Sequence, residues 1–225
     1  MATKEHSTGD DQLIVVEQSL SRAERYIEEN KKSLVIIFLG ILLVVTGYLG
    51  FKKLYVAPKE EDAASEMFMA QRYFEQDSFK LALNGDNNYV GFLYIIENYG
   101  FTKAANLANY YAGVSYLHLG EWEKAIEYLK EFDSSDRMVW ALSVANIGDA
   151  YVELGKYSDA ITYYKKAANT NKNEFTTPVF MMKLAFAHNL AGEKDKALEV
   201  YKDVKEKYPK SAESVQAEKY IARLQ

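Results

Sequence analysis

The sequence predicts an all-α protein with a single transmembrane helix near the N-terminus and an α-solenoid behind it. Two observations lead to this prediction: one long apolar run, residues 33–51, and a short sequence pattern that occurs three times after it. The copies share Gly at the second position and Ala at the seventh, and they occupy residues 119–129, 154–164 and 191–201. Their glycines are 35 and 37 residues apart, within the period of about 20–50 residues that is typical of stacked supersecondary units. We therefore expect three clear helical hairpins, a degenerate one before them and a C-terminal capping helix.

The composition is that of a folded protein whose excess of acid lies outside the N-terminal region. The 225 residues are 48% hydrophobic and carry a net charge of -5. Residues 1–53 hold seven Lys/Arg and seven Asp/Glu, so the surplus acid belongs to the rest of the chain, and binding to nucleic-acid phosphates is not expected. Without cysteine there is no disulfide, no thiolate metal site and no Cys nucleophile, which is compatible with an oxidising compartment.

The apolar run has the length and the flanks of a membrane span. Its nineteen uncharged residues, 33–51, would rise roughly 28 Å as a helix, close to the thickness of a bilayer core. Lysine pairs at 31–32 and 52–53 flank it, and Tyr48 and Tyr55 lie where interface anchors are found. A cleaved signal peptide is disfavoured because the preceding segment is long and charge-balanced. The positive charges near the two ends number four and three, which leaves the orientation undecided.

The segment before the span predicts a short amphipathic helix over residues 12–29. Its apolar positions recur at helical spacing and are Leu13, Val16, Leu20, Ala23 and Ile27. The polar face mixes four glutamates with two arginines, which does not favour an anionic lipid surface. Two interpretations stay open: a solvated helix near the headgroups, or a docking helix for a membrane partner.

A wider comparison of the three copies reveals one repeating unit. The matched positions are Gly113, Tyr116, Gly120, Trp122, Ala125 and Leu129, then Gly148, Tyr151, Gly155, Tyr157, Ala160 and Tyr164, and more loosely Ala185, His188, Gly192, Lys194, Ala197 and Tyr201, followed by Pro209. This series resembles the tetratricopeptide repeat family over about residues 105–209. The physical reasons agree: Gly reverses the chain after the first helix, and Ala lets the second helix cross it closely.

The remaining segments complete the expected organisation. Extra residues around 133–137 and 169–178 indicate loops, and 211–225 place Ala217, Ile221 and Leu224 on one face of a capping helix. Helical spacing upstream of the repeats predicts the degenerate hairpin, with "LALNGDNNY" at 81–89 as a polar insert between its helices. The expected domains are a tail with an amphipathic helix (1–32), the transmembrane helix (33–51), a linker with the degenerate hairpin (52–104), the three repeats (105–209) and the cap (210–225).

No catalytic constellation is recognisable. The histidines His6, His118 and His188 share no metal-binding spacing, and His188 takes a position where the other repeats have Tyr, so a packing role is expected. There is no phosphate-binding loop and no nucleophile motif. The sequence therefore predicts a protein that is not an enzyme and that holds no cofactor or metal.

The resemblance implies that the first helices of successive hairpins line a concave, peptide-binding surface. Carried over position by position, the candidate groove residues are Leu107, Tyr110, Val114, Leu117 and His118, then Leu142, Ala145, Asp149, Val152 and Glu153, then Val179, Met182, Phe186 and Asn189. This set is mostly apolar and contains no Lys or Arg, so a C-terminal carboxylate is a poor candidate ligand. An extended or helical apolar segment suits it better, unless the capping helix or the degenerate hairpin already fills the groove.

The layout also resembles the YfgM-like family of bacterial inner-membrane proteins, through the "EEN" at 28–30 before the span and the "GY" at 47–48 within it. That resemblance implies an ancillary subunit of the Sec translocon, with a cytoplasmic N-terminus and periplasmic repeats. The implied partners are Sec subunits, a membrane-anchored chaperone of the PpiD type and unfolded or apolar client segments. Two alternatives stay open: a scaffold subunit of an envelope secretion or assembly complex without affinity for clients, and an adaptor on a eukaryotic organelle.

Overall fold

The computed structural model describes the backbone of residues 8–225 and the side chains of residues 24 and 26–225. The chain separates into two units at the bond between Ala57 and Pro58, and each unit is described by itself. The helices are α1 (Thr8–Phe51), the π-helix η1 (Lys52–Val56), α2 (Ala57–Glu75), α3 (Phe79–Asn84), α4 (Phe92–Tyr99), α5 (Lys103–His118), α6 (Trp122–Glu131), α7 (Arg137–Glu153), α8 (Tyr157–Thr170), α9 (Thr176–Leu190), α10 (Lys194–Lys207) and α11 (Ala212–Leu224). The described part contains no strand, only one isolated β-bridge, so the all-α prediction is confirmed.

The first unit contains a helix that is long and apolar enough to cross a membrane. The helical stretch Tyr26–Glu75 includes a window with mean hydropathy 2.6, of which 0% is buried. Thr46, a polar residue of the predicted span, donates its hydroxyl hydrogen to the carbonyl oxygen of Leu42 at 2.8 Å, so this hydroxyl is bonded within the helix itself. The backbone of the predicted amphipathic segment is helical within α1, but the apolar side chains that define its face, Ile27 excepted, lie outside the described ones.

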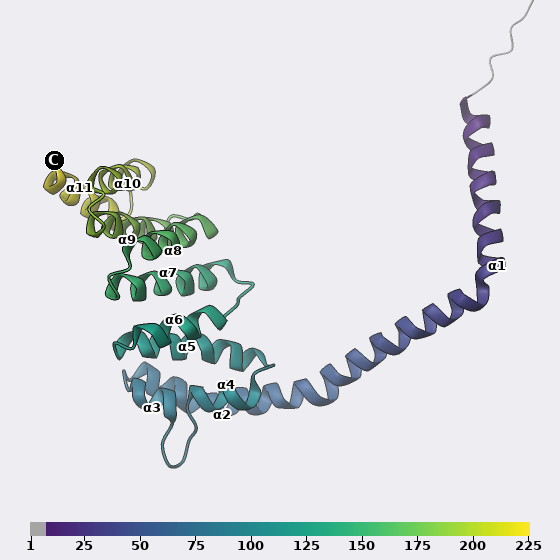
Figure 1. Ribbon diagram of the computed structural model, residues 1–225, viewed down its shortest axis with the longest axis horizontal. Coiled ribbons are helices and arrows are strands. Elements are labelled where there is room, and N and C mark those ends of the chain that lie inside the picture. Colours follow the sequence, from purple (N-terminus) through teal and green to yellow (C-terminus); the bar gives the residue numbers. More distant parts are fainter. Residues whose placement is uncertain (1–7) are drawn as a thin grey trace, which may run out of the picture. The chain divides into compact units, whose positions relative to one another are not determined.

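The second unit is a stack of antiparallel helical hairpins. Figure 1 shows α5 with α6, α7 with α8 and α9 with α10 as successive layers, coloured from teal to yellow-green. Helix α11 packs on α10 and α9 and closes the stack, with Ala217 fully buried among the side chains of both. The predicted solenoid with its capping helix is therefore present.

Each hairpin reverses through the same hydrogen-bonded turn. At the first reversal Gly120 has φ +75°, a left-handed conformation in which a Cβ atom is strained. The amide of Glu121 donates to the carbonyl of Tyr116 at 2.9 Å and that of Gly120 to Leu117 at 3.1 Å, which satisfies the exposed end of α5. The invariant alanine that follows, Ala125, is 0% exposed, because the two helices of the hairpin touch there.

A second glycine in each of the first two repeats permits close packing. A Cβ on Gly148 would lie 2.7 Å from Cε1 of Tyr164, and one on Gly113 would lie 2.5 Å from Cγ of Leu129. Helix α7 thus approaches α8, and α5 approaches α6, so closely that a methyl group has no room.

The degenerate hairpin contains a fourth copy of the repeat turn, which we did not predict. Asp77 takes the place of the turn glycine and has φ +54°. Its backbone amide donates to the carbonyl of Phe74 at 3.0 Å, and the amide of Ser78 donates to the carbonyl of Tyr73 at 2.9 Å. Ala82 is 0% exposed, as Ala125 is in the first clear repeat. Residues 81–84, predicted to belong to a polar insert, are helical instead and form the end of α3, because Ala82 and its neighbour Leu83 are core residues.

The insert interrupts the second helix of this hairpin rather than joining two helices. Helices α3 and α4 are the two halves of that helix, and the chain loops out between Gly85 and Gly91, closed by a β-bridge from Gly85 to Val90. Asp86 holds the loop: one of its oxygens accepts the amides of Asn88 and Tyr89, both at 2.8 Å, and the other accepts the Tyr73 hydroxyl at 2.7 Å. The polar residues of the insert therefore build a defined loop.

A carboxylate from α2 caps the helix that opens the first clear repeat. Glu60 accepts the amide of Lys103 at 2.7 Å and that of Ala104 at 3.0 Å, and the Thr102 hydroxyl accepts the amide of Ala105 at 3.1 Å. Three of the amides that a helix start leaves free are thereby bonded. This contact fixes the degenerate hairpin against α5 and so positions one wall of the candidate groove.

Candidate groove on the first helices of the repeats

The candidate groove is the surface formed by α5, α7 and α9, the first helices of the three clear repeats. Helix α5 packs beside α7, and α7 packs beside α9, so residues from successive repeats come together. All of the predicted groove residues lie on these three helices, but their accessibility differs widely.

Five of the predicted residues line one open cavity at the junction of α5 and α7. The cavity has a volume of about 260 Å³, and its lining is Val114, Leu117, His118, Trp122, Asn146, Asp149 and Glu153. Trp122 begins α6, and Asn146 lies on α7; neither was among the predicted groove residues. Trp122 was matched to the repeat pattern and assigned to packing, so its second role as a cavity wall was not evident from the sequence.

Other predicted residues are buried or partly buried by packing within the stack. Ala145 is 2% exposed, while Leu107, Tyr110 and Val152 pack against the buried clusters of their repeats. Met182 packs in the cluster that joins α9 to α11. Burial between hairpins is thus the main role of these side chains, because a helix in a stack has neighbours on both sides.

Two predicted apolar residues outside this cavity remain exposed. Leu142 is 37% exposed and Phe186 is 43% exposed. Val179 and Asn189 are half-buried on the same helix as Phe186. Helix α11 covers Met182 but packs on α10 and α9, so it does not enter the junction of α5 and α7.

The degenerate hairpin borders the groove through a ring contact. Phe79, at the start of α3, stacks on the His118 ring with 4.3 Å between centroids and 7° between planes. Phe79 takes the place that Trp122 holds in the next repeat, which explains why an aromatic ring is present there. His118 is thereby held at the cavity rim as an aromatic wall.

A lysine that the sequence reasoning missed occupies the junction of α7 and α9. The Lys183 ammonium lies 2.7 and 2.6 Å from the two carboxylate oxygens of Asp149, and the Tyr164 hydroxyl donates to the same carboxylate at 2.6 Å. Burial, with the nearby charge of Asp149, raises the pKa of the Tyr164 hydroxyl, which therefore stays protonated and donates. The predicted groove residues include no Lys or Arg, but Lys183, which lies outside that set, pairs with the aspartate within it.

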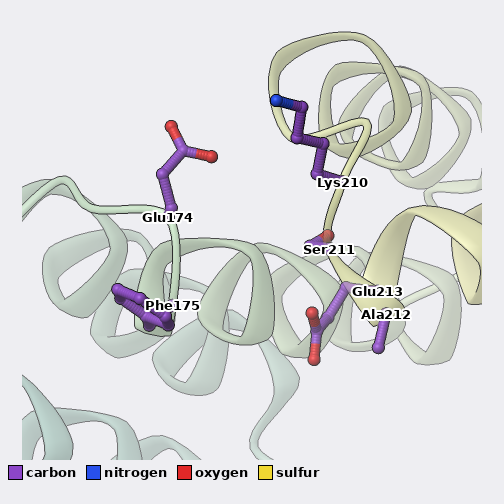
Figure 2. Close-up of a pocket in the computed structure, with 6 residues that line it drawn as sticks. All are labelled: Glu174, Phe175, Lys210, Ser211, Ala212 and Glu213. Atoms are coloured by element: carbon purple, nitrogen blue, oxygen red, sulfur yellow. The ribbon is translucent and has the colours of Figure 1, made fainter.

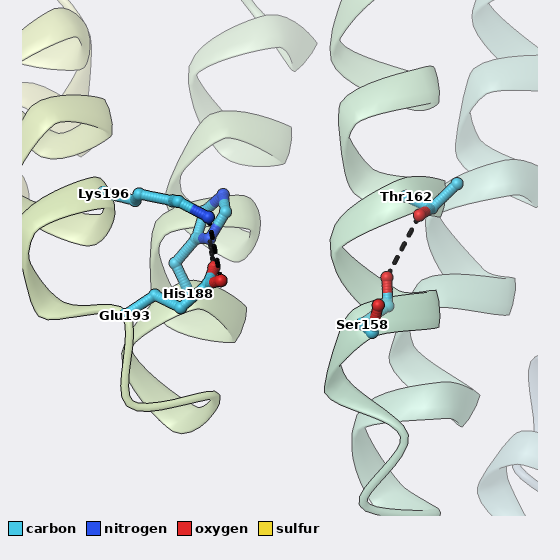
Figure 3. Close-up of polar contacts among 5 residues, drawn as sticks. All are labelled: Ser158, Thr162, His188, Glu193 and Lys196. Carbon is cyan, nitrogen blue, oxygen red and sulfur yellow. Dashed lines mark hydrogen bonds and ion pairs between the residues drawn. The ribbon is translucent and has the colours of Figure 1, made fainter.

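His188 is held by a carboxylate in the turn that follows it. Figure 3 shows its ring beside Glu193, with Nδ1 at 2.6 Å from one carboxylate oxygen, while Lys196 donates to the other oxygen at 2.8 Å. The bonds from Lys196 and then from His188 lower the pKa of Glu193. Figure 3 also shows the Thr162 hydroxyl donating to the Ser158 carbonyl at 3.1 Å, a bond within α8. Within the described residues, no three metal-ligating side chains of the His, Cys, Asp or Glu type come together.

A further cavity lies outside the groove, where the loop before α9 faces the start of α11. Figure 2 shows Glu174 and Phe175 on one side and Lys210, Ser211 and Glu213 on the other, around a cavity of about 340 Å³. Phe175 is 81% exposed, although Asn173 fixes its backbone by accepting the amides of Phe175 and Thr176 at 2.8 Å. The extra residues at 169–178 predicted the position of this loop, but they did not predict that the ring of Phe175 is exposed.

Comparison with known protein families supports the repeat assignment. Two family models, both described as tetratricopeptide repeat, match residues 107–135 and 146–212. No curated protein was found to match the chain.

Among solved structures, similar folds recur at low sequence identity. The nearly identical TPR-like repeats of a kinesin light chain type from Podosopora anserina align with a TM-score of 0.59 at 15% identity, over 73% of this chain and 86% of that one. The apo form of RapI aligns with a TM-score of 0.56 at 16% identity, over 74% of this chain and 46% of that one. These likenesses concern the fold alone. The family models identify the hairpins within residues 107–135 and 146–212 as tetratricopeptide repeats, a type of repeat that serves protein–protein interaction.

Proposed function

We propose that this chain is an ancillary subunit of the Sec translocon in the bacterial inner membrane, with one transmembrane helix, a cytoplasmic N-terminus and periplasmic repeats. Beside a membrane-anchored chaperone of the PpiD type, its groove binds apolar segments of newly exported proteins. The observation that supports this proposal most is the open junction of α5 and α7 in a domain that follows a membrane-spanning candidate.

The chemistry of the groove favours an apolar polypeptide as ligand. The cavity wall combines Val114, Leu117 and Trp122 with a few polar groups, and Leu142 on α7 and Phe186 on α9 expose further apolar area. Such a surface gains free energy when a ligand removes it from water, while sparse polar groups orient the ligand. A newly exported chain that has not yet folded presents apolar segments of this kind.

The partner part of the proposal is tested by purification from the native membrane. The full chain, extracted with a gentle detergent, should carry Sec subunits and a PpiD-type chaperone in stoichiometric amounts. Recovery of a tight complex without any Sec subunit would refute the assignment to the translocon.

The client part is tested by an aggregation assay with the full chain in lipid nanodiscs. The protein should slow the aggregation of an unfolded outer-membrane protein, and the double variant Leu142→Ser with Phe186→Ser should lose much of this effect. Phe175→Ser is the matched control, because Phe175 is more exposed than either residue but lines a different cavity. Equal loss in the control and in the double variant would contradict a specific role for the groove.

The topology can be measured directly because the chain contains no cysteine. Single substitutions Ser7→Cys and Lys210→Cys give one reactive thiol each, before and after the membrane segment. In intact cells whose outer membrane is permeabilised, a membrane-impermeant maleimide should label the second variant only. Labelling of the first variant only would reverse the proposed orientation.

A scaffold function without client binding is the second candidate, and exposed rings outside the groove favour it. Phe175 is 81% exposed, Phe68 on α2 58% and Tyr89 in the insert 49%. Aromatic side chains are common anchors in protein interfaces. In this case the full chain would leave the aggregation of the unfolded protein unchanged, and Phe68→Ser or Phe175→Ser would remove a partner from the purified complex.

A further inference from the structure

The cavity at the junction of α5 and α7 has the size and the polarity of a receptor for one side chain. Its volume of about 260 Å³ is below the roughly 300–1,000 Å³ of small-molecule sites, so it accepts part of a ligand rather than a whole one. One wall is apolar and comes from Val114, Leu117 and Trp122, while the opposite wall carries Asp149 and Glu153. A long side chain with an apolar stem and a polar head fits both walls.

The charge of the polar wall is carried by Glu153. Asp149 is already neutralised, because Lys183 binds both of its oxygens and Tyr164 donates to it as well. Glu153 is exposed at the end of α7, and among the described residues it takes part in none of the ion pairs found. The cavity therefore presents one carboxylate without an ion-pair partner, and the indole ring of Trp122 lines the same cavity.

From these observations we infer that the groove selects client segments in which a Lys or Arg side chain lies among apolar residues. The stem of that side chain packs on Val114, Leu117 and Trp122, and its cationic head pairs with Glu153. Trp122 lines the same cavity, and an indole ring attracts a cation that lies over its face. This inference rests on the proposed function, because it names the residue type that the proposed apolar ligand contributes to the cavity.

The neighbouring junction gives an internal example of the same pairing. Counted from the turn glycines, Lys183 in the third repeat takes the position of Asn146 in the second, and Asp149 takes the position of Val114 in the first. At the junction of α7 and α9 a lysine of the chain itself fills this place, and at the junction of α5 and α7 the cavity is open. A lysine from a ligand would enter the open junction as Lys183 enters the closed one, but its carboxylate partner would be Glu153, because Val114 occupies the place of Asp149 there.

The test compares three short peptides that are acetylated, amidated and identical except at the centre, where an otherwise apolar sequence carries Lys, Gln or Glu. Their binding to the full chain in nanodiscs of zwitterionic lipid is measured by fluorescence anisotropy. We expect the Lys peptide to bind about fivefold more tightly than the Gln peptide, and the Glu peptide to bind most weakly. The preference should shrink at high salt, because an ion pair at an accessible site is screened.

Two variants assign the preference to the cavity. Glu153→Gln removes the charge, and Asn146→Lys supplies an internal cation like Lys183, so both should bind the Lys and Gln peptides equally. Glu127→Gln, an exposed carboxylate of α6 away from the cavity, is the matched control and should keep the wild-type preference.

The possible results separate this inference from the proposed function. Equal binding of the three peptides to the wild type would overturn the inference and leave apolar client binding intact. A preference for Lys that persists in Glu153→Gln would also overturn it. Failure of all three peptides to bind would contradict the proposed function itself, and the inference would fall with it.

Discussion

Removal of the contact between Glu60 and the start of α5 should destabilise that end of the helix, and the loss can be measured there. The substitution is Glu60→Ala. Two amides, those of Lys103 and Ala104, then lose the carboxylate that accepts them at 2.7 and 3.0 Å, while the Thr102 cap stays. Hydrogen bonds to charged groups contribute about 1.5–3 kcal/mol each, but water replaces part of this at a half-exposed site. Capping deletions cost about 0.5–2 kcal/mol, so we expect about 1–2 kcal/mol.

The assay is hydrogen exchange of the full chain in detergent, followed by mass spectrometry of the peptide that covers the start of α5. A loss of about 1.4 kcal/mol corresponds to a tenfold faster exchange of these amides. Exchange in the middle of α7 should stay unchanged, because it does not depend on this cap. Glu61→Ala is the matched control, since Glu61 is exposed on the same turn of α2.

Equally fast exchange at the start of α5 in the Glu60 and Glu61 variants would contradict this prediction. In that case the two bonds contribute nothing in solution, and the degenerate hairpin is held on α5 by its apolar contacts alone. Glu60→Gln refines the result, because the amide keeps one acceptor oxygen and should produce a smaller acceleration than Ala.

Substitutions also test the turns, the close packing and the insert. Gly120→Ala should lower the free energy of unfolding by about 1 kcal/mol in chemical denaturation, because alanine is strained at the positive φ of this position. Steric clash contributes nothing, since the atom nearest to the added Cβ would be 3.7 Å away. Gly148→Ala should cost about 1–2 kcal/mol in the same assay, because overpacking against Tyr164 exceeds the gain in helix propensity; a stabilised variant would contradict this packing. The bonds from Tyr73 and from two amides lower the pKa of Asp86, so their support of the insert is present above the ordinary Asp pKa and is lost as the pH falls through the lowered one. Exchange of the insert amides should accelerate over that acidic range, and Asp86→Asn should remove the pH dependence.

Much of the fold could be predicted because the same residue types recur at the turns and helix crossings of each repeat. Gly120 and Ala125 mark a reversal and a close crossing, and their recurrence gives the hairpins without knowledge of any contact. The fourth turn was missed because Asp77 replaces the glycine there. Asp tolerates a positive φ better than most residues, so the turn kept its conformation while the sequence pattern disappeared.

The groove was less predictable because position on a helix does not determine exposure in a stack. Ala145 and Leu142 were predicted alike, yet the first is 2% exposed and the second 37%. Lys183 was not identified because its partner Asp149 lies 34 residues earlier, on the first helix of the preceding repeat. Such contacts depend on the register between repeats, which a search within one repeat does not consider.

That register explains why one junction of the groove is open and the next is closed. Asp149 lies six residues before its turn glycine and Lys183 nine residues before its own, and the pair bridges α7 and α9 at 2.6 Å. At the preceding junction the same two positions hold Val114 and Asn146, which cannot form an ion pair and which border the cavity instead. In the third repeat the residue six before the glycine is Phe186, which is 43% exposed. Two positions of the repeat therefore decide whether a junction is bridged by an ion pair or left open, and they can vary while the turns and close crossings stay constant.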